Sequence, residues 1–325
     1  MKNILLIGGA GYVGSYLTQK LLDRGYKATV YDLFIYGNTI DPHYNLNLIK
    51  GDIRDLKLLK KIIPSHEAII HLACISNDPS FDLDPDLGKN INFDVFEPLI
   101  KLSIDSGVKH FVYASSSSVY GIKDEQNTNE ESSLHPLTDY SKYKALCEEI
   151  LNKYNSNNFL TTILRPATVC GYSKRQRFDL VVNILTNHAF NNKKILVLGG
   201  DQLRPNIHID DMARAYIKII ESDKTLVNKQ IFNVGFENRS VKDLANLVKN
   251  VIGDNIDIVN QETKDNRSYH ITSEKIKKIL NFENKKTIKH AIEDLNKAFK
   301  EKLFVNSLEN EMYFNIKRMK SINLK

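Results

Sequence analysis

The stretch from Ile4 to Gly14 reads ILLIGGAGYVG, an apolar run that passes directly into a glycine-rich turn. A short apolar run that ends in glycine is typical of a strand buried on both faces of a parallel sheet. After the turn, Val13, Leu17 and Leu21 follow at helical spacing until Gly25 ends the pattern. The order strand, glycine turn, helix predicts the first unit of an α/β fold.

The alternation of strand and helix continues for about the first half of the chain. Apolar runs predict further strands at residues 28–31, 49–52, 68–72, 110–114 and 160–164, and helical spacing predicts helices at residues 56–63, 92–106 and 140–154. Parallel strands joined by helices pack with helices on both faces of the sheet. The sequence therefore predicts an α/β fold with a Rossmann-type doubly wound parallel sheet.

After Arg165-Pro166 the alternation loosens. Helices are expected at residues 178–189, 210–220, 240–251, 273–280 and 288–299, strands at 195–198 and 231–234, and a final helix in the basic tail from Leu303. No linker separates the two halves. We expect a nucleotide-binding domain of residues 1–166 plus about 207–235, interleaved with a smaller substrate-binding lobe of about 167–206 and 236–325.

The composition is that of an ordinary globular protein, with 42% hydrophobic and 26% charged residues and a net charge of +6. Cys74, Cys147 and Cys170 are odd in number and far apart, which is typical of a reducing cytoplasm rather than a disulfide framework. No His-x-x-x-His pair occurs, so no metal is expected. The charge is mild for nucleic-acid binding, and the first apolar run is too short to span a membrane.

The glycine turn suits a dinucleotide. Gly8, Gly11 and Gly14 allow a tight turn, close approach of a pyrophosphate and close packing of helix on strand, while the helix N-terminus, with Tyr12 and Val13, faces the phosphates. Asp32 ends the second expected strand, where it would accept both adenosine-ribose hydroxyls and repel a 2′-phosphate. No arginine or lysine stands in residues 33–49 to compensate, so NAD is expected rather than NADP.

Gly51-Asp52-Ile53 follows the third expected strand. Asp52 could accept a hydrogen bond from the adenine amino group while Ile53 packs on the ring. A helix cap ahead of Asp55 explains Asp52 almost equally well, and the residues leave both readings open.

Tyr140 and Lys144 have a spacing that places both side chains on one helix face. The same spacing occurs at Tyr16/Lys20 and at Tyr313/Lys317. Only the Tyr140 copy follows an expected strand that ends in a run of serines, at residues 115–118. A lysine beside a tyrosine lowers the tyrosine pKa, so this pair could exchange a proton with a hydroxyl group.

Taken together, the motifs resemble the extended short-chain dehydrogenase/reductase family, in its NAD-dependent nucleotide-sugar epimerase/dehydratase branch. The resemblance covers nearly the whole chain, in order: GGAGYVG (8–14), Asp32, GDI (51–53), HLA (71–73), SSSSVYG (115–121), YSKYK (140–144), LRPAT (164–168) and RPNIHIDD (204–211).

The resemblance implies a catalytic set of Ser116, Tyr140 and Lys144. Tyr140 would act as acid and base, Lys144 would bind the nicotinamide ribose, and Ser116 would bond the reacting oxygen. Ser116 is the serine that matches when one counts back from the Val-Tyr-Gly motif. The remaining cofactor contacts that the resemblance adds are Leu72, Ala73 and Pro166.

Two departures from the family pattern bear on the reaction. The 4,6-dehydratases of the family carry Asp-Glu directly after the catalytic serine or threonine, where this chain has Ser117-Ser118. The acid and base for water elimination are therefore missing. Thr168 stands where many members have asparagine, which changes the substrate side of the pocket.

The substrate contacts that the resemblance implies are Asn77, Ser116, Ser117, Thr168, Arg177, Asn183, Arg204 and Arg267. Guanidinium groups suit a nucleotide diphosphate because they donate two hydrogen bonds side by side. Surface arginines that pair with nearby carboxylates, such as Asp210 or Asp265, remain the alternative reading for Arg204 and Arg267.

Three functions are compatible with these residues. The first is an NAD-dependent nucleotide-sugar epimerase that works at C4 through a transient keto sugar. The second is a nucleotide-sugar 4-dehydrogenase or keto-sugar reductase with net redox. The third is a catalytically silent NAD-binding regulator, although such relatives usually lose Tyr140 or Lys144. The resemblance also implies a homodimer.

Overall fold

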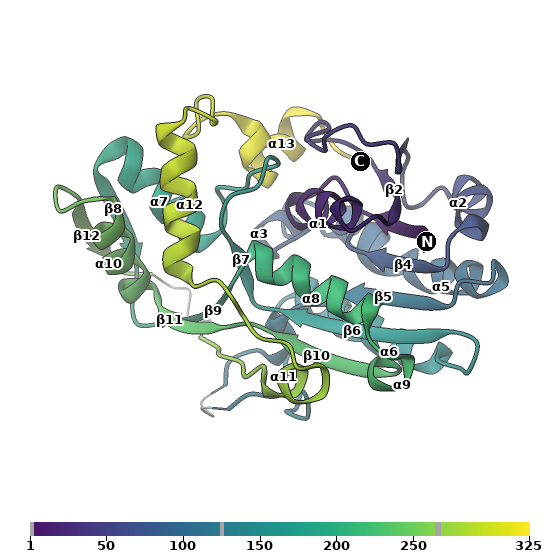
Figure 1. Cartoon of the computed structure of the whole chain (residues 1–325). Helices are drawn as coiled ribbons and strands as arrows, with labels where there is room; N and C mark the ends of the chain where they lie inside the picture. The colour runs from purple at the N-terminus through teal and green to yellow at the C-terminus, as the bar shows by residue number, and fades with distance from the viewer. Residues whose placement is uncertain (1–2, 124–126, 264–267) are drawn as a thin grey trace.

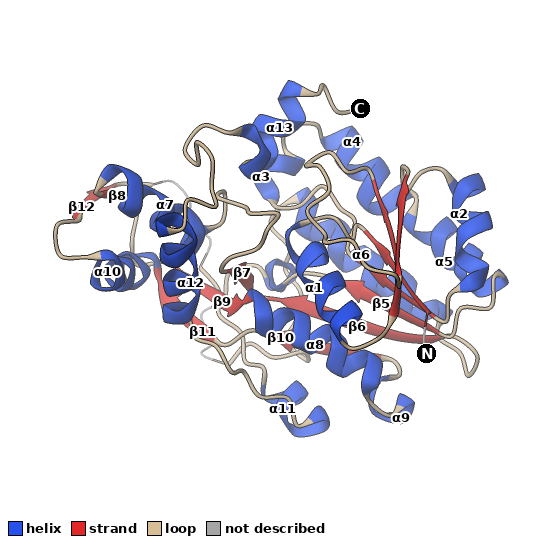
Figure 2. Ribbon diagram, turned by 45° about the horizontal axis from the view of Figure 1, so that its top comes forward, coloured by secondary structure: helices blue, strands red, loops and turns tan. Residues whose placement is uncertain are grey.

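The central feature is a seven-stranded parallel sheet (Figures 1 and 2). The computed structural model describes residues 3–123, 127–263 and 268–325. The strands are β1 (Asn3–Ile7), β2 (Lys27–Asp32), β3 (Leu46–Lys50), β4 (Ala68–His71), β5 (His110–Ala114), β6 (Leu160–Pro166) and β10 (Gln230–Val234). Their order is β10-β6-β5-β4-β1-β2-β3, and every pair is parallel. The chain changes direction across the sheet between β1 and β4, which is where such folds bind ligands.

Helices bury both faces of the sheet. Leu17 and Leu21 of α1 (Tyr12–Asp23) and Met212 of α8 (Ile209–Glu221) belong to the apolar cluster on one face. The other cluster takes residues from α2 (Leu56–Ile62), α5 (Phe96–Asp105) and α6 (Asp139–Tyr154). The doubly wound parallel sheet predicted from the sequence is confirmed.

A second group of elements forms its own core beside the sheet. It consists of α7 (Val181–Asn192), β8 (Lys194–Leu198), α10 (Val241–Ile252), β12 (Asp257–Gln261) and α12 (Ile288–Lys300). A three-stranded sheet of β7 (Thr168–Cys170), β9 (Leu203–His208) and β11 (Glu237–Ser240) lies between this group and the central sheet (Figure 1). The domain boundaries given above stay a prediction.

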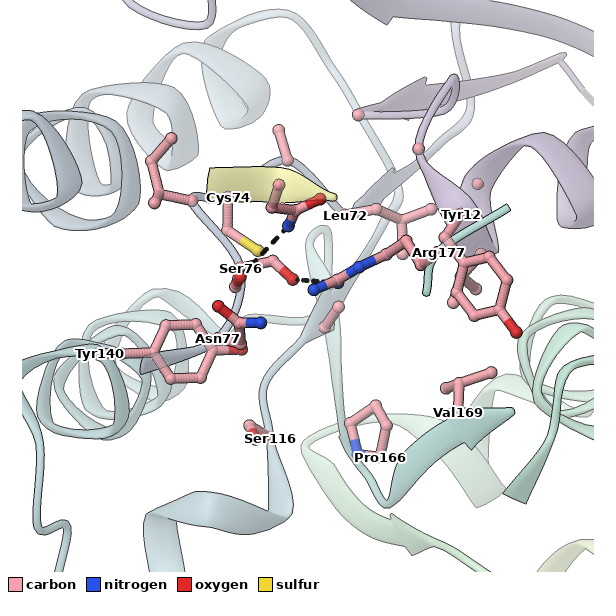
Figure 3. Close-up of a pocket in the computed structure, with 18 of the residues that line it drawn as sticks. Tyr12, Leu72, Cys74, Ser76, Asn77, Ser116, Tyr140, Pro166, Val169 and Arg177 are labelled. Atoms are coloured by element: carbon pink, nitrogen blue, oxygen red, sulfur yellow. Dashed lines mark hydrogen bonds between the residues drawn. The ribbon is translucent and has the colours of Figure 1, made fainter. Parts of the chain in front are cut away.

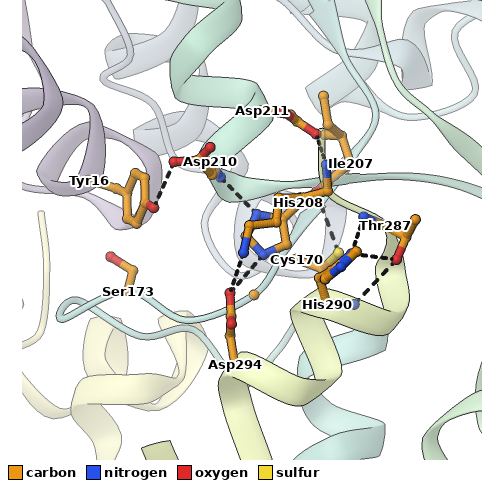
Figure 4. A network of polar contacts seen from close by, with 12 residues as sticks. Tyr16, Cys170, Ser173, Ile207, His208, Asp210, Asp211, Thr287, His290 and Asp294 are labelled. Atoms are coloured by element: carbon orange, nitrogen blue, oxygen red, sulfur yellow. Dashed lines mark hydrogen bonds and ion pairs between the residues drawn. The ribbon is translucent and has the colours of Figure 1, made fainter. Parts of the chain in front are cut away.

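Hydrogen bonds around His208 connect the helices of the central sheet to α12 of the second group of elements (Figure 4). The ring accepts from the Asp210 backbone N–H at 3.0 Å and donates through Nε2 to Asp294 of α12 at 3.1 Å. Asp210 in turn accepts from Tyr16 of α1 at 3.0 Å. The segment that resembles a family motif, residues 204–211, thus joins α1, α8 and α12.

The remaining elements are short. They are α3 (Asp78–Phe81), α4 (Pro85–Lys89), α9 (Lys224–Val227), α11 (Glu274–Leu280) and α13 (Asn315–Ser321), with single turns at Ile63–Ser65, Asn90–Asp94, Ser117–Tyr120 and Glu311–Tyr313. None of the helices that the structure describes is both long and apolar enough to cross a membrane.

Some boundaries differ from the sequence prediction. The third strand ends at Lys50, because Gly51 and Asp52 belong to the turn into α2. The expected helix at 92–106 begins in a π-helical turn, where the Asn92 side chain bonds both backbone groups of Ile75 at 2.8 and 3.0 Å. These two hydrogen bonds fix the loop after β4, and this loop borders the site described next.

Candidate functional site

A cavity of about 350 Å³ lies beyond the carboxyl ends of the central strands. Its walls come from the glycine turn after β1, the loops after β2, β4, β5 and β6, the N-terminal half of α6, and the segment from Asn315 to Leu324. This is the position at which open parallel sheets bind their ligands. Figure 3 shows how side chains from these segments converge.

The glycine turn packs so closely that side chains are excluded from it. Gly8 has φ +83°, and an added Cβ would collide with the Ala73 backbone. At Gly14 an added Cβ would lie 2.6 Å from the Gly8 carbonyl oxygen. At Gly11 it would meet only that oxygen, at 3.4 Å, so the side facing the cavity is open. The turn thus leaves its backbone and the start of α1 accessible to a ligand.

Asp32 is held at the end of β2 by backbone donors. Its carboxylate accepts from the N–H groups of Ala10 at 3.0 Å and Phe34 at 2.8 Å. Burial raises the pKa of this carboxyl, while those two hydrogen bonds oppose the rise. The carboxylate lines the cavity, where it can still accept from a ribose diol.

Ile53 and Gly51 also line the cavity, on the side expected for adenine. Asp55, not Asp52, caps α2 by accepting from the Leu58 N–H at 2.9 Å. Asp52 is paired with Arg54 at 2.7 Å, which holds the pKa of the Asp52 carboxyl below its usual value. Asp52 is the one predicted cofactor residue that is not part of the described lining, and its contact with adenine stays a prediction.

The predicted catalytic side chains meet at the other end of the cavity. Ser116, Tyr140 and Lys144 all line it. Lys144 is buried and donates to the Ala114 carbonyl at 2.7 Å, with its ammonium 4.9 Å from the Tyr113 ring centroid. Tyr140 and Lys144 lie on α6, which is capped at its N-terminus by Thr138. The Thr138 hydroxyl also donates a hydrogen bond to Asp78 at 2.6 Å.

The Tyr140 pKa in the chain alone lies well above its usual value. Burial is the main cause, with Cys74 and Asp78 adding to the rise, while Arg177 and a hydrogen bond with Ser116 oppose it. The lowered pKa expected from the Lys144 spacing is therefore wrong for the chain by itself. The ammonium bonds Ala114 and lies 5.9 Å from the Tyr140 ring centroid.

The predicted substrate residues divide into two groups. The first lines the cavity and comprises Asn77, Ser116, Ser117, Thr168 and Arg177. In the second, Asn183 is fully buried and its amide bonds Gly171, Tyr12 and Arg177. Arg204 lies on β9 with its guanidinium 5.8 Å from the Tyr269 ring centroid, and Arg267 lies outside the described residues. Their contacts with a substrate stay predictions.

Several lining residues were not among the predicted cofactor contacts. Among them are Tyr36, Arg175, Asn315, Met319 and Leu324. Tyr36 stacks on Arg175, whose guanidinium carbon is 3.6 Å from the ring centroid. Asn315 accepts from the Tyr36 hydroxyl at 2.9 Å, across 279 positions of the chain. No local pattern could have predicted contacts at such separations.

The geometry of this cavity fits a dinucleotide. The open backbone at Gly11 and the N-terminus of α1 can receive a diphosphate, Asp32 can receive the adenosine ribose, and Lys144 with Pro166 borders the nicotinamide end. The lining also contains apolar side chains from β1 and from the loops after β2 and β4, which suit the two rings.

Comparison with known proteins yields a consistent result. Residues 4–235 match the model of the NAD dependent epimerase/dehydratase family. A UDP-glucose 4-epimerase of Rhizobium meliloti is 26% identical over 291 residues, covering 76% of this chain and 88% of that protein. A dTDP-D-glucose 4,6-dehydratase of Dictyostelium discoideum is 29% identical over 260 residues, covering 72% of this chain and 58% of that protein.

Among solved structures, a UDP-glucose 4-epimerase of Thermotoga maritima with UDP-glucose superposes with a TM-score of 0.84. It is 26% identical in sequence, and the match covers 93% of this chain and 100% of that one. The similarity therefore extends over both the central sheet and the smaller group of elements.

Proposed function

This chain belongs to the NAD-dependent epimerase/dehydratase family, and from that premise we propose that it is a nucleotide-sugar epimerase acting at C4 of the sugar. The observation that carries the proposal is the meeting of Ser116, Tyr140 and Lys144 in the cavity that the glycine turn and Asp32 also line. The family is NAD-dependent, and its enzymes act on nucleotide sugars.

Each residue has a role that its position supports. NAD, when bound, supplies a reversible hydride acceptor. Tyr140 in its phenolate form, which the ammonium of Lys144 and the positive charge of oxidised NAD would favour, takes the proton of the sugar hydroxyl and returns it after the sugar has turned over. Lys144, fixed by the Ala114 carbonyl, holds the ribose hydroxyls at this end of the cavity. Ser116 donates to the sugar oxygen, its own position being fixed by the Ser118 N–H at 3.1 Å.

Dehydration is disfavoured by the groups beside Ser116. Ser117 and Ser118 occupy the positions at which the family's dehydratases carry an acid and a base. Asp78 is a second carboxyl in the lining besides Asp32, but it follows β4 and does not stand at either of the two positions beside Ser116, and it accepts a hydrogen bond from Thr138 at the cap of α6. Hydride chemistry at one carbon remains the reaction that the described side chains support.

Net oxidation or reduction at C4 is the second candidate, because the same three residues would serve it. The outer wall of the cavity favours epimerisation. Asn315, Met319 and Leu324 form part of this wall, and Met319 is 4% exposed. We expect this wall to slow release of the cofactor, so that NAD stays bound between half-reactions, as an epimerase requires.

The direct experiment is incubation with UDP-, GDP-, CDP- and dTDP-sugars, followed by absorbance at 340 nm and by NMR. Appearance of the 4-epimer without net NADH supports the proposal. Stoichiometric NADH or a stable keto sugar would indicate the dehydrogenase instead. No turnover with any of the sugars, and no change on Tyr140→Phe, would favour the silent NAD-binding protein.

A homodimer and a cytoplasmic location also stay predictions. Light scattering should give about twice the chain mass of 37.2 kDa, and a monomer would refute the dimer.

A further inference from the structure

Two buried arginines lie in the wall of the cavity, on the segment that contacts Tyr12 at the start of α1. Arg175 is 3% exposed and Arg177 is 8% exposed, and both line the cavity. Figure 3 shows Arg177 between Tyr12 and Ser76. A buried guanidinium group is costly unless each of its charges and donors finds a partner.

Each of the two arginines has a guanidinium nitrogen that forms no hydrogen bond within the described part of the protein. Arg175 donates to the Gln176 carbonyl at 3.2 Å and to Asn315 Oδ1 at 3.0 Å, and its Nε has no hydrogen-bond partner. No carboxylate within the described ranges forms an ion pair with it. Burial lowers the pKa of Arg175 to about 10. Such a cation is stabilised by an anion that enters the cavity.

Arg177 is paired but retains one open donor. Its Nε donates to Asp179 at 2.8 Å and its Nη1 to the Ser76 hydroxyl at 2.7 Å. Its Nη2 is buried without a hydrogen-bond partner. The two side chains therefore present two unused N–H donor groups.

The loop that carries the arginines is fastened to the glycine turn itself. The Ser173 hydroxyl donates to the Tyr12 carbonyl at 3.3 Å, and the Tyr12 hydroxyl donates to the Gly171 carbonyl at 2.6 Å. Tyr12 is the first residue of α1, whose first N–H groups lack partners within the helix. An anion at the start of α1 therefore has the arginine loop as its neighbour.

We propose that Arg175 and Arg177 bind the diphosphate of the dinucleotide cofactor, together with the glycine turn. The inference rests on the proposed function only for the identity of the cofactor. It departs from the sequence prediction that assigned Arg177 to the substrate. The Tyr36 stack and the Ser76 bond keep the two arginines beside the loops after β2 and β4, whereas Arg204 is on β9 and outside this lining.

The test compares ligands that differ in the diphosphate. Arg175→Met and Arg177→Met keep most of the side-chain volume and remove the charge. Calorimetric titration should show the affinity for NAD and for ADP-ribose falling about 10- to 100-fold in each variant, because charge-assisted hydrogen bonds are lost. The affinity for adenosine, and for UDP as a probe of the substrate side, should stay within about twofold.

Arg24→Met is the matched control. Arg24 is an exposed arginine paired with Glu221 at 2.9 Å on the outside of the molecule, and its removal changes the net charge equally. The affinity of Arg24→Met for ADP-ribose should equal that of the wild-type protein. A loss there equal to that of Arg175→Met would mean that the long-range charge, not a site, is responsible, and would overturn the proposal.

Other outcomes also decide. Unchanged ADP-ribose affinity in both variants, or a loss confined to UDP, would overturn the assignment to the cofactor. If the arginines are only structural, the melting temperature without ligand falls and adenosine binding falls with it. Because no sugar takes part, these results are independent of whether the protein epimerises one.

Discussion

Tyr140 is the residue on which the proposed chemistry depends, and its surroundings oppose its ionisation. Burial, Cys74 and Asp78 raise its pKa, so the phenol is neutral near pH 7 in the chain alone. Its ring packs edge-on against Phe81 at 6.5 Å. The ring thus contributes packing, and the hydroxyl group is the part that would transfer the proton.

Replacement of Tyr140 by phenylalanine should preserve the fold and remove the proton transfer. Turnover should fall about 10²- to 10⁴-fold, the usual contribution of a general acid or base, while NAD affinity changes little. Tyr143→Phe is the control, since Tyr143 lies on the same helix and packs on Phe93 at 5.0 Å. Equal turnover of both variants, measured with a sugar that the protein epimerises, would remove Tyr140 from the mechanism.

His71 makes a prediction about stability against pH. It is 2% exposed at the end of β4, and burial together with Lys144 lowers its pKa from 6.5 to about 3. Below pH 6.5 the unfolded chain therefore binds a proton that the folded chain does not. Stability is retained above pH 6.5 and is lost as the pH falls toward 3.

Urea unfolding of the wild type and of His71→Leu, each at pH 7 and pH 5, isolates this effect. Between the two pH values the wild type should lose about 2 kcal/mol more unfolding free energy than the variant. His66 and His188, whose pKa values are also lowered by burial, are present in both proteins and cancel. Identical losses would show that His71 titrates normally.

At the residue scale, the sequence predicted the site residues that belong to short local motifs. Gly8–Gly14 could be placed because they follow β1 directly, and Asp32 because it ends β2, whereas Tyr140 was distinguished by its spacing from Lys144 and by the serine run after β5. The structure brings them to one cavity. Arg175 and Asn315 could not be placed together, because 140 positions separate them. For the chain alone, the shift of the Tyr140 pKa was predicted with the wrong sign because the spacing from Lys144 does not reveal how strongly burial opposes ionisation of the phenol.

At the element scale, α6 connects the site to the sheet. Tyr140, Lys144 and Glu148 follow each other at i, i+4 and i+8 on one face of the helix. Glu148 accepts from Arg165 at the end of β6 at 2.6 Å and from the Ser115 hydroxyl at the end of β5. This buried pair holds the two strand ends that carry Ser116 and Pro166.

Glu148→Gln should therefore destabilise the whole protein. Removal of one partner leaves the Arg165 charge buried and uncompensated, which costs about 3–5 kcal/mol in unfolding free energy. Glu221→Gln removes the exposed partner of Arg24 and should cost less than about 1 kcal/mol. If denaturant melts give similar losses for both, the Glu148 pair does not anchor the helix.

The elements that sequence reasoning located well are long and periodic. The expected helix at 288–299 is found as α12 (Ile288–Lys300), and that at 240–251 as α10 (Val241–Ile252). The strands β7, β9, β11 and β12 were missed. They are three to six residues long and carry polar residues, and they become strands through pairing with distant partners.

At the scale of the whole molecule, the segment from Asn315 to Leu324 covers part of the cavity, on the side of the loop that follows β2. Asn315 donates from its backbone to Asp179 at 3.0 Å, and Arg318 donates to the Ile35 carbonyl at 2.6 Å. In Figure 1, α13 lies beside the loop that follows β2. The sequence predicted a final helix but not its place over the site, since no local pattern shows which surface it covers.

Asn315→Ala should loosen this closure without removing a lining charge. The Tyr36 hydroxyl and Arg175 both lose their acceptor, so NAD should dissociate about tenfold faster, the equivalent of one lost hydrogen bond of about 1.4 kcal/mol. Asn310→Ala removes the cap of the short helical turn nearby and serves as the control. Equal dissociation rates in stopped-flow displacement would show that the segment does not retain the cofactor.

The central claim is a closed hydride cycle at C4 of a nucleotide sugar. The measurement that tests it most directly uses the sugar found in the nucleotide screen, labelled with deuterium at C4 and followed by NMR. The account predicts a 4-epimer that keeps its deuterium at C4, with no net NADH. Loss of the label to solvent, or its appearance in free NADH beside a keto sugar, would contradict the account.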